Sequence, residues 1–463
     1  MQDAAHNHNR QPALADAADS LSDTDSLDAG PMVMSGSSSK STYFLFLGMG
    51  LATLLPWNLF ISASEFYSYQ FAGSVHQQTF QNSFSVAYMV TNFMFNMYAM
   101  VTVTNSDPNR RIFAGLAANT LVYVVGLIMP LMRDYRGAPS FYIVMLQLAT
   151  TAAASGMLTN SLFALVAHFS PSHVEGVFSG QATAGIIATV AQLVTAYSVK
   201  PTDFAASAVP DDKVAEGLIF RTIAYFAFAT AVNLFLTAAF WHIKRDPYYR
   251  QQSKLACPSS SSLSDVDAES ELLISRSTPN SPPLAAGIEA FRTTFKQISG
   301  YTYVILLDFS ITLAVFPSIT AMVTSTSGFK LLTEWHFFLY NCGDLIGRRL
   351  APSLAIFRSS SLFAIALARI LFIPAFFACH VSFSVWNNWI ESDYVFLALV
   401  VLLGITNGFL STRSAMLAPS LSDQPTIAGS IVAISISTGL AMGSVLSWPV
   451  RAAGCMCSPF GGR

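Results

Sequence analysis

Charge is scarce in this sequence. Asp, Glu, Lys and Arg make up 11% of the 463 residues, whereas a soluble domain carries about 25%. The formal net charge of −2 argues against a nucleic-acid partner, because phosphate binding requires a basic patch. Hydrophobic residues reach 52% and aromatic residues 13%, so the composition predicts a protein that is embedded in a lipid bilayer.

Reactive and metal-binding motifs are also missing. The five cysteines fall at no CxxC spacing, which favours free thiols over a disulfide framework or a zinc site. The histidines of the apolar stretches follow no ligand spacing, and neither HExxH nor GxSxG occurs. We therefore expect no catalytic residues, no metal site and no cofactor, and a membrane enzyme is disfavoured. The first 42 residues also lack the basic and apolar regions of a cleavable signal peptide.

Long apolar runs dominate the chain instead. A bilayer core about 30 Å thick requires roughly 20 apolar residues per helix, and about eleven such stretches are present. They cover residues 43–62, 83–104, 112–132, 141–167, 177–199, 218–242, 300–323, 333–357, 361–383, 394–418 and 427–449. The sequence predicts an all-α polytopic membrane protein with about 11 transmembrane helices.

A polar stretch divides these runs into six and five. Its Ser, Pro and Asp content cannot build a core, and its Lys and Arg residues form the densest basic run in the chain, which the positive-inside rule assigns to the cytoplasm. The predicted parts are a disordered cytoplasmic N-terminal tail at 1–42, a six-helix bundle at 43–242, a disordered cytoplasmic linker at 243–299, a five-helix bundle at 300–449 and a short extracellular tail at 450–463.

Pro56 and Pro317 are two of the prolines that fall inside the apolar spans. Pro56, in "GMGLATLLPWNLF", removes a backbone hydrogen bond and predicts a broken helix beside a cavity. Trp57 and Asn58 follow it and offer an aromatic face and an amide to a ligand, although tryptophan is also common in interfacial belts. Pro317 follows Phe316 in "DFSITLAVFPSIT" and lies within the seventh span.

Small residues form stripes on two spans. Gly176 and Gly180 stand four residues apart in the fifth span, and Gly439 and Gly443 repeat this spacing in the last span. Such stripes let helix backbones approach closely. Gln181, beside Gly180, either lines a cavity or bonds across the packing seam.

The stretch "YNCGDLIGRRLAP" places charges within an apolar span. Asp344 and Arg348 are four residues apart on one helical face, with the acid on the N-terminal side, which is the favoured order for an ion pair. Asn341 extends this polar stripe, whereas Arg349 points about 100° away and can reach the headgroups. The stripe could bind a polar, hydroxyl-bearing solute. Alternatively, the pair only pins the helix or gates a cytoplasmic loop.

Arg413, in the tenth span, is a further isolated charge. A charge at the bilayer centre costs at least about 3 kcal/mol unless it is paired or wet. Few other acids lie in the apolar spans, so we expect Arg413 to pair with Asp308 or Asp344.

Five motifs together resemble those of one family. "GMGLATLLPWNLF", "SGQATAG", "ITLAVFPSIT", "YNCGDLIGRRL" and "IAGSIVAISISTGLAMGSV" occur in order and in the appropriate spans. From about residue 43 to 451 the chain resembles the equilibrative nucleoside transporter family. This resemblance implies a major-facilitator-like fold, in which bundles of six and five helices enclose a central site that opens alternately to each side.

The resemblance also implies roles for particular residues. Asp344 and Arg348 would hold the ribose hydroxyls of a nucleoside. Residues around the base and sugar would be Leu54, Trp57, Met89 and Phe337, and the cavity wall would be completed by Phe316, Pro317, Asn341 and Leu440. The residue chemistry agrees, since a nucleoside presents a stacking face at one end and vicinal hydroxyls at the other.

Three positions depart from the family pattern and bear on the substrate range. Thr159 stands where many members place a glutamine that contacts the base, alanine follows Gln181 where a second glycine is frequent, and Arg413 is unexpected.

We expect a facilitative carrier of nucleosides, with purine nucleosides such as adenosine foremost, that works as a monomer in the plasma membrane with a cytoplasmic N-terminus.

Other carriers remain as alternatives. "DLIGRR" also resembles the DxxGRR loop motif of the major facilitator superfamily, but here it lies within an apolar span rather than in a short loop. A carrier of the same fold for a nucleobase, an organic cation or a monoamine, with or without proton coupling, stays open.

Overall fold

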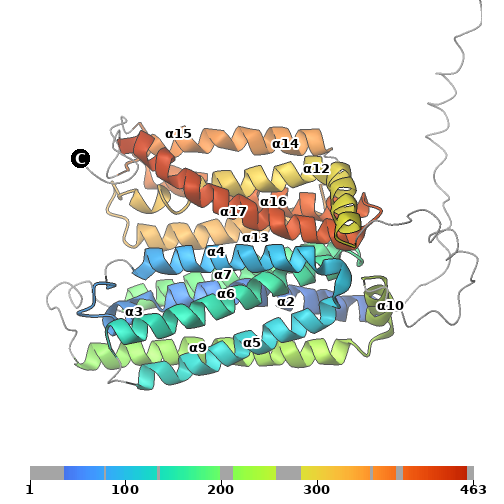
Figure 1. Cartoon of the computed structure of the whole chain (residues 1–463). Helices are drawn as coiled ribbons and strands as arrows, with labels where there is room; N and C mark the ends of the chain where they lie inside the picture. Colours follow the sequence, from blue (N-terminus) through green and yellow to red (C-terminus); the bar gives the residue numbers. More distant parts are fainter. Residues whose placement is uncertain are drawn as a thin grey trace, which may run out of the picture.

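The computed structural model describes residues 36–77, 80–132, 136–198, 212–256, 283–354, 358–381 and 389–455. Within these ranges the chain folds into helices, and the extended backbone forms isolated bridges but no strand. The long helices run roughly side by side along one axis (Figure 1). The predicted all-α class is confirmed.

The helices fall into an earlier and a later group along the chain, which occupy the lower and upper parts of Figure 1. The earlier group comprises α2 (Gly36–Ser62), α3 (Ser64–Gln70), α4 (Phe80–Val101), α5 (Pro108–Ile128), α6 (Ala138–Val166), α7 (Pro171–Ser198), α9 (Asp212–Ile243) and α10 (Pro247–Ala256). The later group comprises α12 (Pro283–Val315), α13 (Leu332–Leu350), α14 (Ser359–Ala368), α15 (Phe372–Phe377), α16 (Asp393–Ser420) and α17 (Pro425–Cys455).

Nine of the described helical segments are long and apolar enough to cross a membrane. The predicted spans at 83–104 and 333–357 correspond to α4 and α13, and these two helices are not among the nine. α4 packs against α6 and α17, and α13 packs against α16 and α7. Asn96 of α4 and Asp344 of α13 are both buried, so these two helices direct polar groups toward protein. The count of eleven spans stays a prediction.

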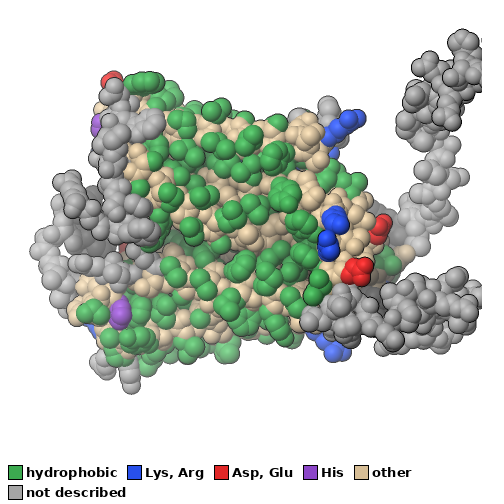
Figure 2. All heavy atoms as spheres, turned by 45° about the horizontal axis from the view of Figure 1, so that its top comes forward, with side chains coloured by type: hydrophobic (Ala, Val, Ile, Leu, Met, Phe, Trp, Pro, Cys, Tyr) green, Lys and Arg blue, Asp and Glu red, His purple; other side chains and the backbone are tan. Residues whose placement is uncertain are grey.

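The sides of the bundle are apolar, as a bilayer requires. Green apolar side chains cover much of the side that faces the viewer in Figure 2, and blue and red side chains gather at one end. Leu146, Phe235 and Val445 are each about 70% exposed. Apolar exposure on this scale fits a lipid-facing surface.

Part of the predicted linker at 243–299 is helical, because α10 and the first turns of α12 lie within it. Tyr249 anchors α10: its ring packs on Phe169 and Phe240, and its hydroxyl donates a hydrogen bond to Asn109 Oδ1 at 2.7 Å. The polar composition of the segment predicted disorder and did not indicate that Tyr249 packs against the bundle. Residues 36–42 and 450–455 of the predicted tails are also helical, in α2 and α17, so the predicted disorder does not hold at 36–42. The remainder of the predicted tails and linker, at 1–35, 257–282 and 456–463, lies outside the described residues.

The two prolines act differently from the prediction. α2 continues through Pro56, so the predicted break there is wrong. Close packing supports this helix: a Cβ built on Gly50 would lie 1.9 Å from the carbonyl oxygen of Val177 in α7. α12 instead ends at Val315, directly before Phe316 and a Pro317 joined to it by a cis peptide bond. Proline therefore ends α12 but not α2.

Candidate functional site

A close crossing of α13 and α16 positions the charged motif. A Cβ built on Gly347 would lie 2.0 Å from the carbonyl oxygen of Ile405, and one on Gly408 would lie 2.0 Å from that of Asp344. Side chains at these positions would collide with backbone, so the glycines let the two helices touch. The "GDLIGRR" glycines thus bring Asp344 directly against α16.

The Asp344 carboxylate lies between two donors. Arg348 Nε donates to Oδ2 at 2.7 Å, and both side chains of this ion pair are 5% exposed. Asn407 of α16 donates from Nδ2 to Oδ1, also at 2.7 Å. The predicted ion pair is confirmed, and Asn407 is an additional member that the sequence pattern did not indicate.

Arg348 also reaches across to the earlier helices. Its Nη1 donates to the carbonyl oxygen of Phe178 at 2.8 Å and lies 3.4 Å from Gln181 Oε1, while its guanidinium sits over the Phe178 ring. Gln181 in turn donates to Thr53 Oγ1 of α2 at 3.2 Å. Arg348 therefore links α13 to α7, and through Gln181 to α2.

An aromatic group adjoins this stripe on α13. Phe316 stacks on Tyr340 with ring centroids 4.0 Å apart and meets Phe337 edge-on at 5.2 Å. Asn341 donates from its amide to the carbonyl oxygen of Phe337 at 2.9 Å and faces Gly185 of α7. Five predicted site residues thus lie on or beside α13: Phe316, Phe337, Asn341, Asp344 and Arg348.

The aromatic and amide groups of α2 lie elsewhere. Trp57 packs on Tyr88 with centroids 4.9 Å apart and lines a pocket between α2 and α4. Asn58 lines a different pocket, between α2, α7 and α9. Neither pocket is lined by Asp344 or Arg348.

The remaining predicted residues are distributed over several helices. Pro317 is exposed, and those that are partly buried are Leu54 of α2, Met89 of α4, Thr159 of α6 and Leu440 of α17. Met89 packs against the aromatic core around Phe84, and Leu440 packs against the main core.

The predicted pairing of Arg413 is wrong. Asp308 instead forms an ion pair with Arg369, from the turn that follows α14, and these side chains are 0% and 2% exposed. Arg413 donates to the carbonyl oxygen of Ala351 at 3.4 Å. Arg369 was missed, although it is the only charged residue of the predicted span at 361–383, which is the signal that could have identified it.

A second polar seam, also missed, joins the two groups of helices. Asn96 of α4 donates to Ser437 of α17 at 2.8 Å, and Asn160 of α6 donates to Asn96 Oδ1 at 3.0 Å. Ser430 of α17 donates to Asn160 Oδ1 at 3.1 Å. Asn160 directly follows Thr159, so the candidate base contact adjoins this seam.

A third contact lies at the end of the bundle where α2 begins, here termed the α10 end. Arg349 of α13 donates to the Tyr43 hydroxyl at 2.5 Å and lies 3.6 Å from Glu175 of α7. Tyr43 donates to the other Glu175 oxygen at 3.0 Å, and Ser179 donates to the same carboxylate. This contact closes the seam between α7 and α13.

Comparison with known proteins decides the family. The family model described as nucleoside transporter matches residues 145–452. The chain belongs to the nucleoside transporter family. Human equilibrative nucleoside transporter 2 is 26% identical, with 90% of this chain and 99% of the relative covered. Equilibrative nucleotide transporter 1 of Arabidopsis thaliana is 25% identical, with 88% and 85% covered. These relatives are transporters, and this member of their family is not an enzyme.

Solved structures agree on the fold of this nucleoside transporter family member. The E. coli fucose:proton symporter matches with a TM-score of 0.53 and 14% identity over 91% of this chain and 93% of that one. A human organic anion transporter matches with a TM-score of 0.51 and 15% identity, with 91% of this chain and 96% of that chain covered. A symporter structure described as a major facilitator superfamily transporter gives 0.50. The predicted major-facilitator-like architecture is confirmed.

Proposed function

We propose that the protein is a facilitative carrier of nucleosides, with purine nucleosides such as adenosine among its substrates, and that it works by alternating access. Asp344 and Arg348 bind the ribose hydroxyls. The observation that carries this proposal is the buried ion pair on α13, at the seam between the earlier and later helices.

The carboxylate of Asp344 has capacity left for a ligand. Each carboxylate oxygen offers about two acceptor sites, and the contacts with Arg348 and Asn407 use one on each oxygen. One acceptor per oxygen is thus available to a hydroxyl donor. Vicinal ribose hydroxyls supply two such donors, and the Arg348 guanidinium supplies charge-assisted donors to their oxygens.

The same contacts connect binding to closure. Arg348 donates a hydrogen bond to the carbonyl oxygen of Phe178 across the seam. A sugar that binds this guanidinium therefore weakens a hydrogen bond between the two groups of helices. A ligand shifts a conformational equilibrium only through such differential contacts.

The α10 end carries Lys244, Arg245, Arg250 and Lys254, and this basic run supports its placement in the cytoplasm. An epitope tag at the N-terminus should then be accessible to antibody only after the membrane is permeabilised. Plasma-membrane residence and action as a monomer are part of the same proposal.

Uptake into liposomes that contain the purified protein tests the carrier. Labelled adenosine should enter saturably, recovered chemically unchanged, until the internal and external concentrations are equal, and unlabelled nucleosides should compete. Accumulation above the external concentration under a sodium or proton gradient would refute the passive mechanism. Competition by nucleobases or organic cations but not by nucleosides would refute the substrate class.

A further inference from the structure

A fully buried ion pair lies behind the candidate site. Arg369 contacts the Asp308 carboxylate, and its Nη1 also donates to the Asp308 backbone carbonyl at 3.0 Å. Burying two charges in a low-dielectric interior is costly, and a hydrophobic pair of similar volume is often as stable. Stability alone therefore does not explain why this half of the molecule carries the pair.

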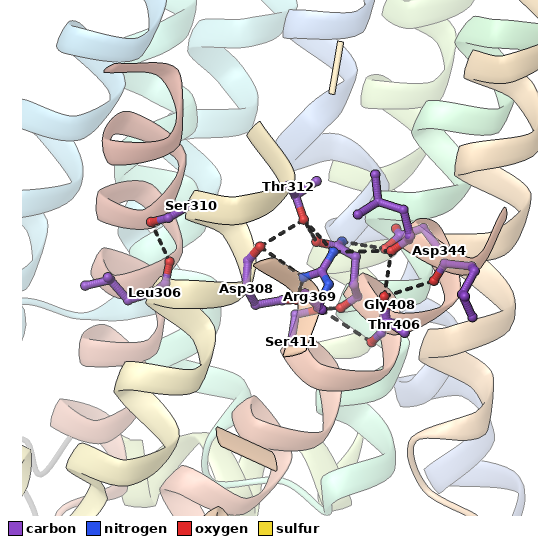
Figure 3. A network of polar contacts seen from close by, with 12 residues as sticks. Leu306, Asp308, Ser310, Thr312, Asp344, Arg369, Thr406, Gly408 and Ser411 are labelled. Carbon is purple, nitrogen blue, oxygen red and sulfur yellow. Dashed lines mark hydrogen bonds and ion pairs between the residues drawn. The ribbon is translucent and has the colours of Figure 1, made fainter. Parts of the chain in front are cut away.

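A line of hydrogen bonds runs from this ion pair to Asp344 (Figure 3). Arg369 Nη2 donates to Thr312 Oγ1 at 2.7 Å. Thr312 Oγ1 donates to Asn407 Oδ1 at 2.8 Å, and Asn407 Nδ2 donates to Asp344 Oδ1 at 2.7 Å. Four helical elements contribute one residue each: the turn after α14, α12, α16 and α13.

The line has a fixed direction. A guanidinium can only donate, so Thr312 Oγ1 accepts from Arg369. The single hydroxyl proton of Thr312 is then left to donate. That proton is within reach of Asn407 Oδ1 and of the Asp308 carbonyl at 2.9 Å. When Asn407 accepts through its oxygen, its amino group faces Asp344. The flipped amide would instead aim an oxygen at the carboxylate, which is repulsive.

We propose that Arg369, held in place by Asp308, is a positioning residue for sugar recognition that acts through Thr312 and Asn407. It fixes the Asn407 amide so that the Asp344 carboxylate is held from the side opposite Arg348, with its remaining acceptor sites directed to the substrate. This inference rests on the proposed binding of ribose by Asp344.

Thr312→Val tests the proposal, since it removes the hydroxyl but keeps the shape and leaves both ion pairs in place. Loss of one hydrogen bond costs roughly 1 kcal/mol, so the half-saturation concentration for adenosine should rise about fivefold. That for 2′,3′-dideoxyadenosine should change less than about twofold, because it lacks the hydroxyls that Asp344 binds. Thr312→Ser, which restores the hydroxyl, should restore adenosine uptake.

Thr302→Val is the matched control. Thr302 lies on the same helix, is equally buried, and donates to a carbonyl of its own helix, so neither substrate should be affected. Asn407→Ala removes the next member of the line and should also raise the half-saturation concentration for adenosine selectively. This variant tests the proposal independently if Thr312→Val is poorly expressed.

Asp344→Asn separates this proposal from the proposed function. If Asp344→Asn weakens adenosine selectively and neither Thr312→Val nor Asn407→Ala does so, the positioning role is refuted while the sugar site stands. Equal weakening of both substrates by Thr312→Val also refutes it, since that result indicates a packing role. If Asp344→Asn shows no selectivity, the sugar site fails and the positioning role fails with it.

Discussion

At the scale of single residues, the Asp344 region shows how a polar site is built inside a membrane protein. The acid is only 4% exposed, and its charge is compensated by Arg348 and by the Asn407 amide. An uncompensated charge at such depth would cost several kcal/mol. Compensation from two sides keeps the carboxylate in the bundle and leaves acceptors for a ligand.

Arg348→Lys should impair uptake although it conserves charge. Arg348 uses Nε for Asp344 and Nη1 for the Phe178 carbonyl, and a lysine ammonium is a compact point charge that lacks this fork. We expect at least a roughly tenfold loss of adenosine uptake at equal surface amount. Arg110→Lys is the control, because Arg110 is 89% exposed and its ion pair with Asp107 lies at the surface, so the change should be tolerated. Equal losses for the two variants would contradict this role of the Arg348 fork.

The residue patterns in the sequence were informative where partners are local. The i, i+4 spacing predicted the pair of Asp344 and Arg348, whereas the partner of Asp308 depended on how distant helices pack. Arg413 was assigned an acid because both are rare in the spans, but Arg369 takes Asp308 and a backbone carbonyl meets Arg413. Charge scarcity alone does not determine which helices are neighbours.

At the scale of helices, glycine stripes decide which elements touch. Gly343 and Gly347 of α13 meet the α16 backbone, and Gly180 of α7 meets that of α2. The predicted close approach at Gly180, and at Gly443 of α17 against Ser310 of α12, is confirmed. The glycine stripes of α13 (Gly343 and Gly347) and α16 (Gly404 and Gly408) were not predicted.

Gly347→Ala should destabilise the protein. Its Cβ would lie 2.0 Å from the Ile405 carbonyl oxygen, and overpacking of this kind costs about 1–3 kcal/mol. The melting temperature in detergent should fall clearly. In the α9 control Gly217→Ala, the Cβ would meet nothing within 4 Å, and alanine favours the helix by about 1 kcal/mol. A melting temperature of Gly347→Ala as high as that of Gly217→Ala would contradict the proposed crossing.

Helix positions were largely predictable from apolar run length, but helix ends were not. α12 begins at Pro283 rather than near residue 300, because polar residues extend a helix beyond the bilayer without altering the apolar run. Pro56 and Pro317 have the same local signature, yet only the second ends its helix. The proline alone therefore does not determine where a helix ends.

At the scale of the whole molecule, the earlier and later helices meet along polar seams. α7 meets α13 through Arg348 and Arg349, and α4 and α6 meet α17 through Asn96 and Asn160. α4 and α13 are the predicted spans that do not qualify by length and hydropathy, and both lie at these seams. The polarity that weakens these two membrane-span predictions therefore lies at the seams, where we propose that the solute path runs.

Alternating access requires that the contact at the α10 end opens and closes. Arg349→Ala should loosen it, because Glu175 is 5% exposed and would lose its cationic partner. We expect faster hydrogen–deuterium exchange at residues 171–179 of α7. Arg110→Ala, which breaks an exposed ion pair with Asp107, is the control and should leave exchange unchanged. Unchanged exchange in Arg349→Ala would show that this contact does not hold the seam.

The most direct test of the central claim, that Asp344 recognises the sugar, is the half-saturation concentration of Asp344→Asn for paired substrates in liposomes. A hydrogen bond to a charged group contributes about 1.5–3 kcal/mol. Sugar binding by Asp344 therefore predicts a rise of roughly tenfold or more for adenosine and less than about threefold for 2′,3′-dideoxyadenosine. Equal rises for both substrates would contradict it and would assign Asp344 to holding the helices together.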